Sequence, residues 1–115
     1  MAEQDTNEIV ICDLAHKILY MNPVACRHYE RFGGEKLVGK NLLNCHNPKS
    51  VERIVQILAW FQVSASNNRV HTFYNEKENK DVYMVALRGD DGALIGYYEK
   101  HEYRNRDMGA LYEMA

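Results

Sequence analysis

The stretch Gly39-Lys40-Asn41-Leu42-Leu43-Asn44-Cys45-His46-Asn47-Pro48-Lys49-Ser50 leads directly into Val51-Glu52-Arg53-Ile54-Val55-Gln56-Ile57-Leu58-Ala59-Trp60-Phe61. The second part has apolar residues along one stripe of a helix and polar residues away from it. Asn47 and Pro48 predict the start of this helix, with Asn as the N-cap and Pro at the first helical position. Two side chains able to bind a metal, Cys45 and His46, therefore lie at the helix entrance, where a small domain can present them to a ligand.

The composition indicates one small globular domain. The chain has 115 residues, of which 46% are hydrophobic and 26% charged, which is ordinary for a single core. Fourteen basic and sixteen acidic residues give a net charge of −2, and no basic stripe is present, so nucleic acid is not an expected partner. No apolar run reaches the length of a membrane span and no signal segment opens the chain. We therefore expect a cytoplasmic protein with no membrane partner.

The cysteines do not form a recognisable motif. Cys12, Cys26 and Cys45 are irregularly spaced, so neither a disulfide framework nor a structural zinc site is indicated. Cys12 lies in an apolar run and Cys26 in a helical pattern. We expect both to be buried thiols.

The first part of the chain predicts a hairpin followed by a helix. The β-type runs are Glu8 to Asp13 and Lys17 to Met21, and the short link between them is typical of a hairpin. Asn22-Pro23 then predicts a helix start, and Gly33-Gly34 marks the end of the helical pattern.

The last third of the chain is β in character. Its runs are Arg69 to Asn75, Asp81 to Arg88 and Ala93 to Tyr103, separated by turn-forming segments. The middle run is apolar on both faces, which predicts a central strand. The order of elements is β-β-α, short helices, then α-β-β-β. This order favours an α+β fold, with a five-stranded antiparallel sheet and helices packed on one face.

This pattern resembles the PAS domain family. The resemblance rests on the Leu37-Val38-Gly39-Lys40 turn, the Gly92-Ala93-Leu94-Ile95-Gly96 hairpin and the string from Asn44 to Val51. That string is similar to the Cys-His-Pro-Pro-Lys-Ser sequence of a subgroup sometimes joined to hemerythrin-like domains, although Asn47 stands where the subgroup has its first Pro. The resemblance implies an N-terminal tail over residues 1–6, a PAS-like sensor domain over 7–104, and a tail or truncated linker helix over 105–115.

What the resemblance implies is a sensory or regulatory module and not an enzyme. Such a module holds a small ligand between sheet and helices, forms a homodimer and passes a conformational change to an effector domain or partner protein. Many family members end in an Asp-x-Thr element. This chain has Glu99-Lys100-His101-Glu102-Tyr103-Arg104 at that place, which leaves the route of signal output open.

Haem is the first alternative ligand. His46 or Cys45 would supply the axial ligand, with His46 the preferred metal ligand, because imidazole and thiolate both bind haem iron. The competing interpretation is structural: His46 caps a turn and Asn47 caps the helix.

Nucleophilic catalysis by the Cys45–His46 pair is disfavoured, because adjacent loop residues rarely point at each other and no oriented carboxylate accompanies them.

Aromatic side chains supply a second set of candidate ligand contacts. Trp60 and Phe61 on the helix and Tyr83, Tyr97 and Tyr98 on strands would line a flat cavity. The competing interpretation places them in the core or in an interface, with Trp60 as a dimer contact. A ligand-free scaffold that only dimerises or docks a partner is therefore the second alternative, and the identity of any ligand stays open.

Overall fold

The structure, a computed structural model, describes residues 8–77, 79–102, 111, 112 and 114, with the side chain of Cys45 excepted. In chain order the elements are β1 (Ile9–Asp13), β2 (Ile18–Met21), α1 (Pro23–His28), the 3-10 helices η2 (Glu30–Phe32), η3 (Gly34–Leu37) and η4 (Leu42–Cys45), α2 (Pro48–Val63), β3 (Arg69–Asn75), β4 (Lys80–Arg88) and β5 (Leu94–Glu102). The α+β prediction is confirmed. The tail predicted over 1–6, and most of that over 105–115, lies outside the described residues.

The five strands form one antiparallel sheet in the order β2-β1-β5-β4-β3, as predicted. β5 is the last strand in sequence but the middle strand of the sheet, and it pairs with β1 on one side and β4 on the other. β4 lies between β5 and β3, which agrees with its apolar character on both faces. The first and last parts of the chain therefore meet in the centre of the sheet.

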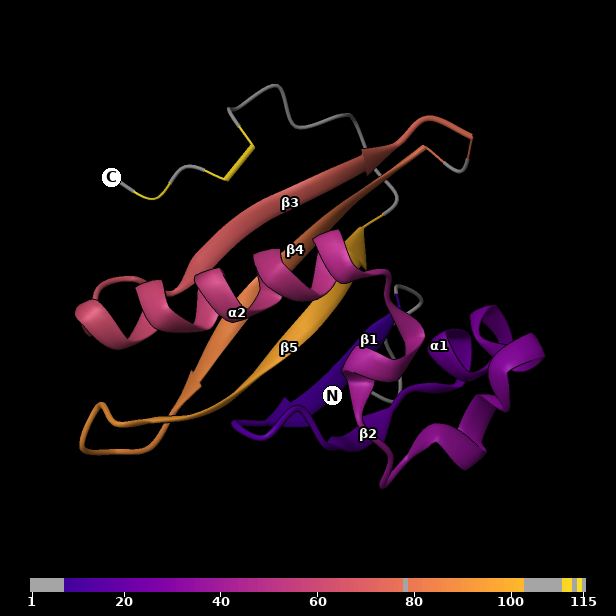
Figure 1. Cartoon of the computed structure of the whole chain (residues 1–115), viewed down its shortest axis with the longest axis horizontal. Helices are drawn as coiled ribbons and strands as arrows, with labels where there is room; N and C mark the ends of the chain where they lie inside the picture. The colour runs from indigo at the N-terminus through magenta and orange to yellow at the C-terminus, as the bar shows by residue number, and fades with distance from the viewer. Residues whose placement is uncertain (1–7, 78, 103–110, 113, 115) are drawn as a thin grey trace.

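Helix α2 lies across β3, β4 and β5 on one face of the sheet (Figure 1). Its start is fixed by Asn47, whose Oδ1 accepts a hydrogen bond from the Ser50 N–H at 2.8 Å. Its end is fixed by Arg88 of β4, whose guanidinium donates to the carbonyls of Phe61, Ser64 and Asn67. Phe61 lies in the last turn of α2, where carbonyls have no partner within the helix, and Ser64 is the C-cap, so Arg88 both caps α2 and ties it to the sheet.

Helix α1 is shorter than the sequence pattern predicted. Instead of continuing to Gly33, it ends at His28 and is followed by the turns η2 and η3. Gly33 and Gly34 both have positive φ angles, and a Cβ on Gly34 would lie 3.1 Å from the carbonyl oxygen of Cys26. The chain therefore folds back tightly onto α1, and this close return ends the helix.

The side of the core next to α1 is densely packed. Its side chains surround a void of only about 10 Å³, and they come from β1, β2, η3, η4 and the residue that follows α1: Val10, Ile18, Met21, Leu37, Leu42 and Tyr29. Cys12 is 1% exposed, and burial raises the pKa of its thiol to about 12, as expected of a buried cysteine. Cys26 is only partly buried, so its predicted burial is wrong in degree.

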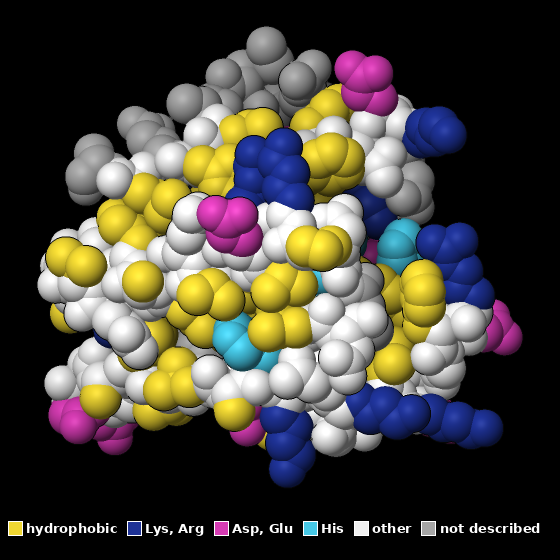
Figure 2. Space-filling view, viewed as in Figure 1, with side chains coloured by type: hydrophobic (Ala, Val, Ile, Leu, Met, Phe, Trp, Pro, Cys, Tyr) yellow, Lys and Arg dark blue, Asp and Glu magenta, His cyan; other side chains and the backbone are white. Residues whose placement is uncertain are grey.

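The surface over α2 carries both apolar and basic side chains. Figure 2 shows this face, with hydrophobic groups gathered around Lys and Arg side chains. Exposed apolar residues here include Val55 and Val63 of α2, together with Phe73 and Leu111. Within the described part of the chain, no helix combines the length and the apolar character that a membrane span requires.

Candidate functional site

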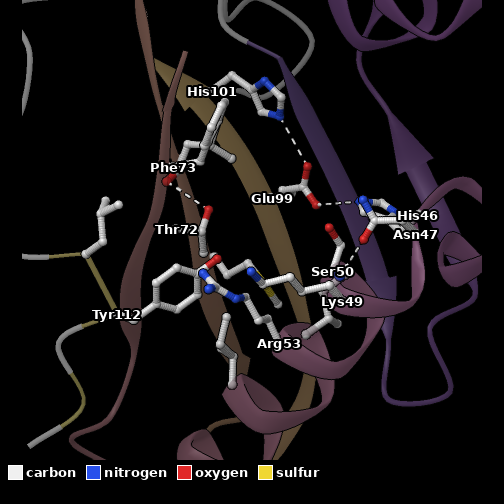
Figure 3. Close-up of a pocket in the computed structure, with 15 residues that line it drawn as sticks. His46, Asn47, Lys49, Ser50, Arg53, Thr72, Phe73, Glu99, His101 and Tyr112 are labelled. Atoms are coloured by element: carbon white, nitrogen blue, oxygen red, sulfur yellow. Dashed lines mark hydrogen bonds and ion pairs between the residues drawn. The ribbon is translucent and has the colours of Figure 1, made fainter. Parts of the chain in front are cut away.

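A cavity of about 500 Å³ lies between α2 and the strands β3, β4 and β5 (Figure 3). Its lining combines apolar groups with charged and hydrogen-bonding ones. The lining residues are His46, Asn47, Lys49, Ser50, Arg53, Ile54, Ile57, Thr72, Phe73, Val82, Met84, Glu99, His101, Leu111 and Tyr112.

The helix side of the cavity follows from helical periodicity. Ser50, Arg53, Ile54 and Ile57 all line the cavity and are spaced three or four residues apart, so they share one face of α2. Ile54 and Ile57 are buried, whereas Arg53 is only partly buried. The first turns of α2 therefore contribute polar groups to the cavity and the middle of the helix contributes apolar ones.

The sheet side follows from strand alternation. Val82 and Met84 of β4, and Glu99 and His101 of β5, line the cavity, because alternate residues of a strand point to the same face. On β3 both Thr72 and Phe73 line it, and the pairing with β4 shifts register between His71 and Phe73. This irregularity brings two consecutive side chains to one cavity.

His46 points one ring nitrogen at the cavity. Its Nδ1 lies 3.0 Å from the carbonyl oxygen of Leu42. Because a carbonyl only accepts hydrogen bonds, Nδ1 carries the proton, and in neutral His46 the other nitrogen, Nε2, has an unprotonated lone pair. Nε2 lies 3.9 Å from Oε2 of Glu99. The side chain that ends η4 thus faces a carboxylate on the central strand.

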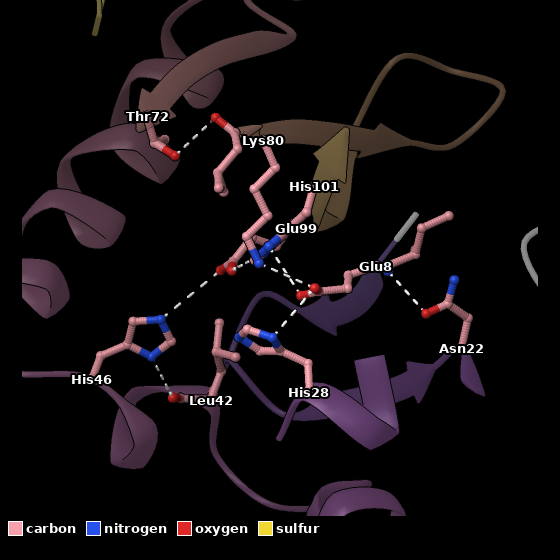
Figure 4. Close-up of polar contacts among 11 residues, drawn as sticks. Glu8, Asn22, His28, Leu42, His46, Thr72, Lys80, Glu99 and His101 are labelled. Carbon is pink, nitrogen blue, oxygen red and sulfur yellow. Dashed lines mark hydrogen bonds and ion pairs between the residues drawn. The ribbon is translucent and has the colours of Figure 1, made fainter. Parts of the chain in front are cut away.

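Behind the cavity lies a cluster of ionisable side chains that is buried except at His28, and we call it the Glu8 cluster: Glu8, His28, Lys80, Glu99 and His101 (Figure 4). Glu8 is 1% exposed and Lys80 2%. Oε1 of Glu8 lies 3.1 Å from Nζ of Lys80 and 3.3 Å from Nδ1 of His28. Buried charges are tolerated when they are paired in this way.

His101 connects the Glu8 cluster to the cavity. Its Nδ1 lies 3.0 Å from Oε2 of Glu8 and its Nε2 lies 3.2 Å from Oε1 of Glu99. Burial alone would lower the pKa of His101, but the two carboxylates outweigh it and raise the pKa to about 9. Likewise, burial would raise the pKa of Glu99, but His101, and His46 when it is protonated, hold it below its usual value. At neutral pH, His101 is therefore a cation and Glu99 an anion.

The opposite side of the cavity is basic. Lys49 and Arg53 of α2 line it, and the Arg53 guanidinium carbon lies 4.5 Å from the ring centroid of Tyr112. Figure 3 shows Arg53 beside Tyr112, across the cavity from His46 and Glu99. The lining therefore has a carboxylate at one end and two basic side chains at the other.

Of the site residues predicted from sequence, His46 and Asn47 line the cavity. Both also have the structural roles that the competing interpretation gave them, since His46 follows η4 with its ring bonded to Leu42 and Asn47 caps α2. The Cys45 backbone ends η4, but its side chain lies outside the described residues.

The predicted aromatic contacts are not part of this lining. Phe61 is fully buried in the core, and Trp60 is partly buried and packs against it. Tyr83 follows Val82 on β4, so it points to the other face of the sheet, where it stacks on His71 with the ring centroids 4.9 Å apart. Tyr98 precedes Glu99 on β5 and points to that same face.

Sequence reasoning missed the charged side chains of the cavity and of the Glu8 cluster. Glu99 and His101 are two residues apart on a predicted strand. The sequence pattern therefore did contain a signal for them, namely two ionisable residues on one face of the strand. Glu8 and Lys80 lie 72 residues apart and carry no such signal, because only the fold brings them within 3.1 Å.

Chemically, the cavity is suited to binding a polar molecule through several charged groups. Within the part of the chain that the structure describes, no three His, Cys, Asp or Glu side chains come together as a metal site. His46 and Glu99 supply two polar atoms at one end, and Lys49 and Arg53 supply positive charge at the other.

Comparison with solved structures identifies the fold. The C-terminal domain of a Streptococcus mutans protein matches with a TM-score of 0.67 and 20% identity, covering 88% of this chain and 78% of that one. A PAS domain from Colwellia psychrerythraea matches with a TM-score of 0.66 and 14% identity, covering 90% and 91%. The Aer2 receptor of Vibrio cholerae, a dual PAS-heme oxygen sensor, matches with a TM-score of 0.58 and 20% identity, covering 84% and 92%.

Sequence comparison adds no closer relative. No family model matches the chain, and no curated protein matches it significantly. At 20% identity or less, the structural likeness establishes architecture and leaves the ligand open. The fold of this chain is the PAS fold, as the resemblance in its sequence implied.

Proposed function

We propose that this chain is a sensory module that binds a small ligand in the cavity between α2 and β3–β5, without catalysing a reaction. The observation that supports this most is the cavity itself, about 500 Å³ with apolar walls and charged ends. A ligand-free scaffold has no need of such a space. A cavity of this size, largely preformed and with few polar contacts, is typical of a small-molecule site.

Signalling would follow from the positions of the contacts. The lining comes from the first turns of α2, from η4 and from the central strand β5. A ligand that binds better to one packing of α2 on the sheet shifts the population towards that packing. An effector domain or a partner protein would then read the new packing.

A homodimer would be one means of readout. Val55 is 50% exposed and Val63 78%, and both lie on α2 near the partly buried Trp60. Light scattering coupled to size-exclusion chromatography tests this proposal. We expect a dimer that Val55→Glu converts to a monomer, whereas Leu19→Glu, on β2, leaves it intact. A wild-type monomer at all concentrations would exclude it.

The ligand proposal is tested by native mass spectrometry of the purified protein and by thermal shift with a metabolite panel. Ser50→Trp should fill the mouth of the cavity and abolish binding. Glu52→Trp, two residues later and exposed on α2, is the matched control and should bind normally. If no compound binds the wild type better than Ser50→Trp, the ligand-free scaffold is the better explanation.

Haem binding through His46 is a second candidate. It is supported by the hydrogen bond to Leu42, which leaves Nε2 as the ligating atom. Against it, Glu99 Oε2 is 3.9 Å from Nε2, so this arrangement does not fit a porphyrin unless that carboxylate moves. An absorption spectrum with added hemin decides the question. A Soret band that disappears in His46→Ala establishes haem, and no band leaves an organic ligand.

A further inference from the structure

Two acceptor atoms face each other at one end of the cavity. Neutral His46 donates through Nδ1 to Leu42, so its Nε2 has only a lone pair to offer. Opposite it, at 3.9 Å, is Oε2 of Glu99, and at neutral pH Glu99 is an anion. The 3.9 Å separation is longer than a hydrogen bond, so neither atom satisfies the other, and a ligand group that donates to both can bridge them.

The Glu8 cluster does not supply that donor. His101 donates through Nε2 to Oε1 of Glu99, and its Nδ1 is directed at Glu8. Among the described residues, none makes a hydrogen bond to Oε2 of Glu99. Glu99 is only 8% exposed and lines the cavity, so little solvent surrounds this second oxygen. A charged oxygen in a mostly buried side chain is costly to leave without a full set of partners, and a ligand that satisfies it gains that energy.

The other end of the cavity favours a negatively charged group. Lys49 and Arg53 line it, and Figure 3 places Arg53 across the cavity from Glu99. An Arg guanidinium binds a carboxylate through two parallel hydrogen bonds. Between the two ends the lining is apolar, with contributions from Ile54, Ile57 and Met84.

We propose that the cavity takes a small zwitterion of the amino-acid class. Its ammonium group lies between Nε2 of His46 and Oε2 of Glu99, its carboxylate lies at Arg53 and Lys49, and its side chain is apolar. An ammonium group has three polar hydrogens and can donate to both acceptors. A hydroxyl has one hydrogen and would leave one acceptor facing an oxygen. This inference rests on the proposed function and specifies its ligand class.

The test uses the wild-type protein and matched probes. Thermal shift with the twenty standard L-amino acids comes first, followed by calorimetric titration. For L-leucine, 4-methylpentanoate is the analogue without the ammonium group and 3-methylbutylamine is the analogue without the carboxylate. We expect an apolar amino acid to bind, and each analogue to bind about 10- to 100-fold more weakly, the loss typical of a hydrogen bond to a charged group.

Substitutions at the two ends of the cavity test which end binds which charged group of the ligand. Glu99→Gln should weaken binding of the amino acid about 10-fold or more and leave the deaminated analogue unchanged. Arg53→Gln should have the reverse effect: it should weaken binding of the deaminated acid and leave binding of the amine unchanged. Lys36→Gln, outside the cavity lining, is the control. The comparison of analogues on the wild type remains valid even if Glu99→Gln does not fold.

Two outcomes overturn the inference. One is that no amino acid binds, and the other is that the deaminated acid binds as tightly as the amino acid. If native mass spectrometry finds a different small molecule that Ser50→Trp excludes, the proposed sensory function stands and only the ligand class is wrong. If nothing binds at all, both are wrong.

Discussion

The two halves of the molecule are filled differently. Beneath α1 and the 3-10 helices, aliphatic side chains leave a void of about 10 Å³. Beneath α2 the same sheet leaves about 500 Å³. Both helices begin with the same Asn-Pro pair and both lie against the sheet. The difference is therefore in what the facing side chains are and not in how the helices begin.

What distinguishes the hollow half is the charge on the central strand. Glu99 and His101 of β5 are ionised. Burying them under aliphatic side chains would cost free energy, because aliphatic groups offer no hydrogen-bond partners. The Glu8 cluster satisfies one side of them, and the cavity remains on the other. The packed half contributes more apolar packing to stability, and the hollow half leaves the cavity in which we propose that a ligand binds.

The largest expected effect is the loss of the central acid. Glu8→Gln removes the anion that pairs with both Lys80 and His101, so two buried cations lose a charged partner. We expect a loss of about 3–5 kcal/mol in the free energy of unfolding, measured by urea denaturation. Glu52→Gln, on the surface, should change it by less than about 0.5 kcal/mol. A loss below about 1 kcal/mol for Glu8→Gln would mean that the cluster is hydrated.

Truncation of one isoleucine in each half tests the difference directly. Ile18 and Ile57 are each 1% exposed, but only Ile57 lines the cavity. Ile18→Ala creates a new void and should cost about 3–5 kcal/mol, whereas Ile57→Ala enlarges an existing one and should cost nearer 2 kcal/mol. Equal losses would show that the hollow half collapses around its cavity in solution.

The Glu8 cluster should also make stability depend on pH. The folded pKa of His101, about 9, exceeds its ordinary value of 6.5, so its contribution is complete below pH 6.5 and is lost as the pH rises through 9. This rise in the pKa of His101 corresponds to roughly 3 kcal/mol in the free energy of unfolding. Glu99 has a lowered pKa, so its contribution is lost on acidification below its ordinary value of 4.5. Denaturation from pH 4 to 10 should show a maximum between these limits.

His101→Gln is the control for that pH dependence. It should remove the alkaline decline and also weaken the acid decline, because His101 is the main group that lowers the pKa of Glu99. An unchanged alkaline decline in this variant would assign it to another group.

The smallest expected difference is between the two helix caps. Asn22 is fully buried, and its Oδ1 accepts from Ala25 N–H at 3.0 Å and from Ile9 N–H at 3.1 Å. Asn47 is exposed, and among the described residues its Oδ1 accepts from the Ser50 N–H alone. Asn22→Ala should therefore cost about 2 kcal/mol and Asn47→Ala about 1 kcal/mol. Thermal denaturation of both variants gives the comparison, and the reverse order would contradict it.

Much of the fold could be predicted because its signals are local. Asn22-Pro23 and Asn47-Pro48 locate the helix starts, and alternation locates the strands. The site was harder to predict, because its chemistry depends on contacts between residues that are distant in sequence. The 3.1 Å pair of Lys80 and Glu8 exists only once β5 has joined β1 to β4. His46 was found because it lies beside a helix start, whereas Tyr83 was misplaced because alternation alone does not say which face holds the cavity.

The position of β5 limits how a signal can leave the domain. β5 carries Glu99, which lines the cavity, and the strand ends three residues later at Glu102. It is hydrogen-bonded along both edges, to β1 and to β4. Sliding it would break two ladders at once. Under the proposed function, a conformational change at the cavity would therefore act through twisting of the whole sheet or tilting of α2 against it, and not through movement of β5 alone.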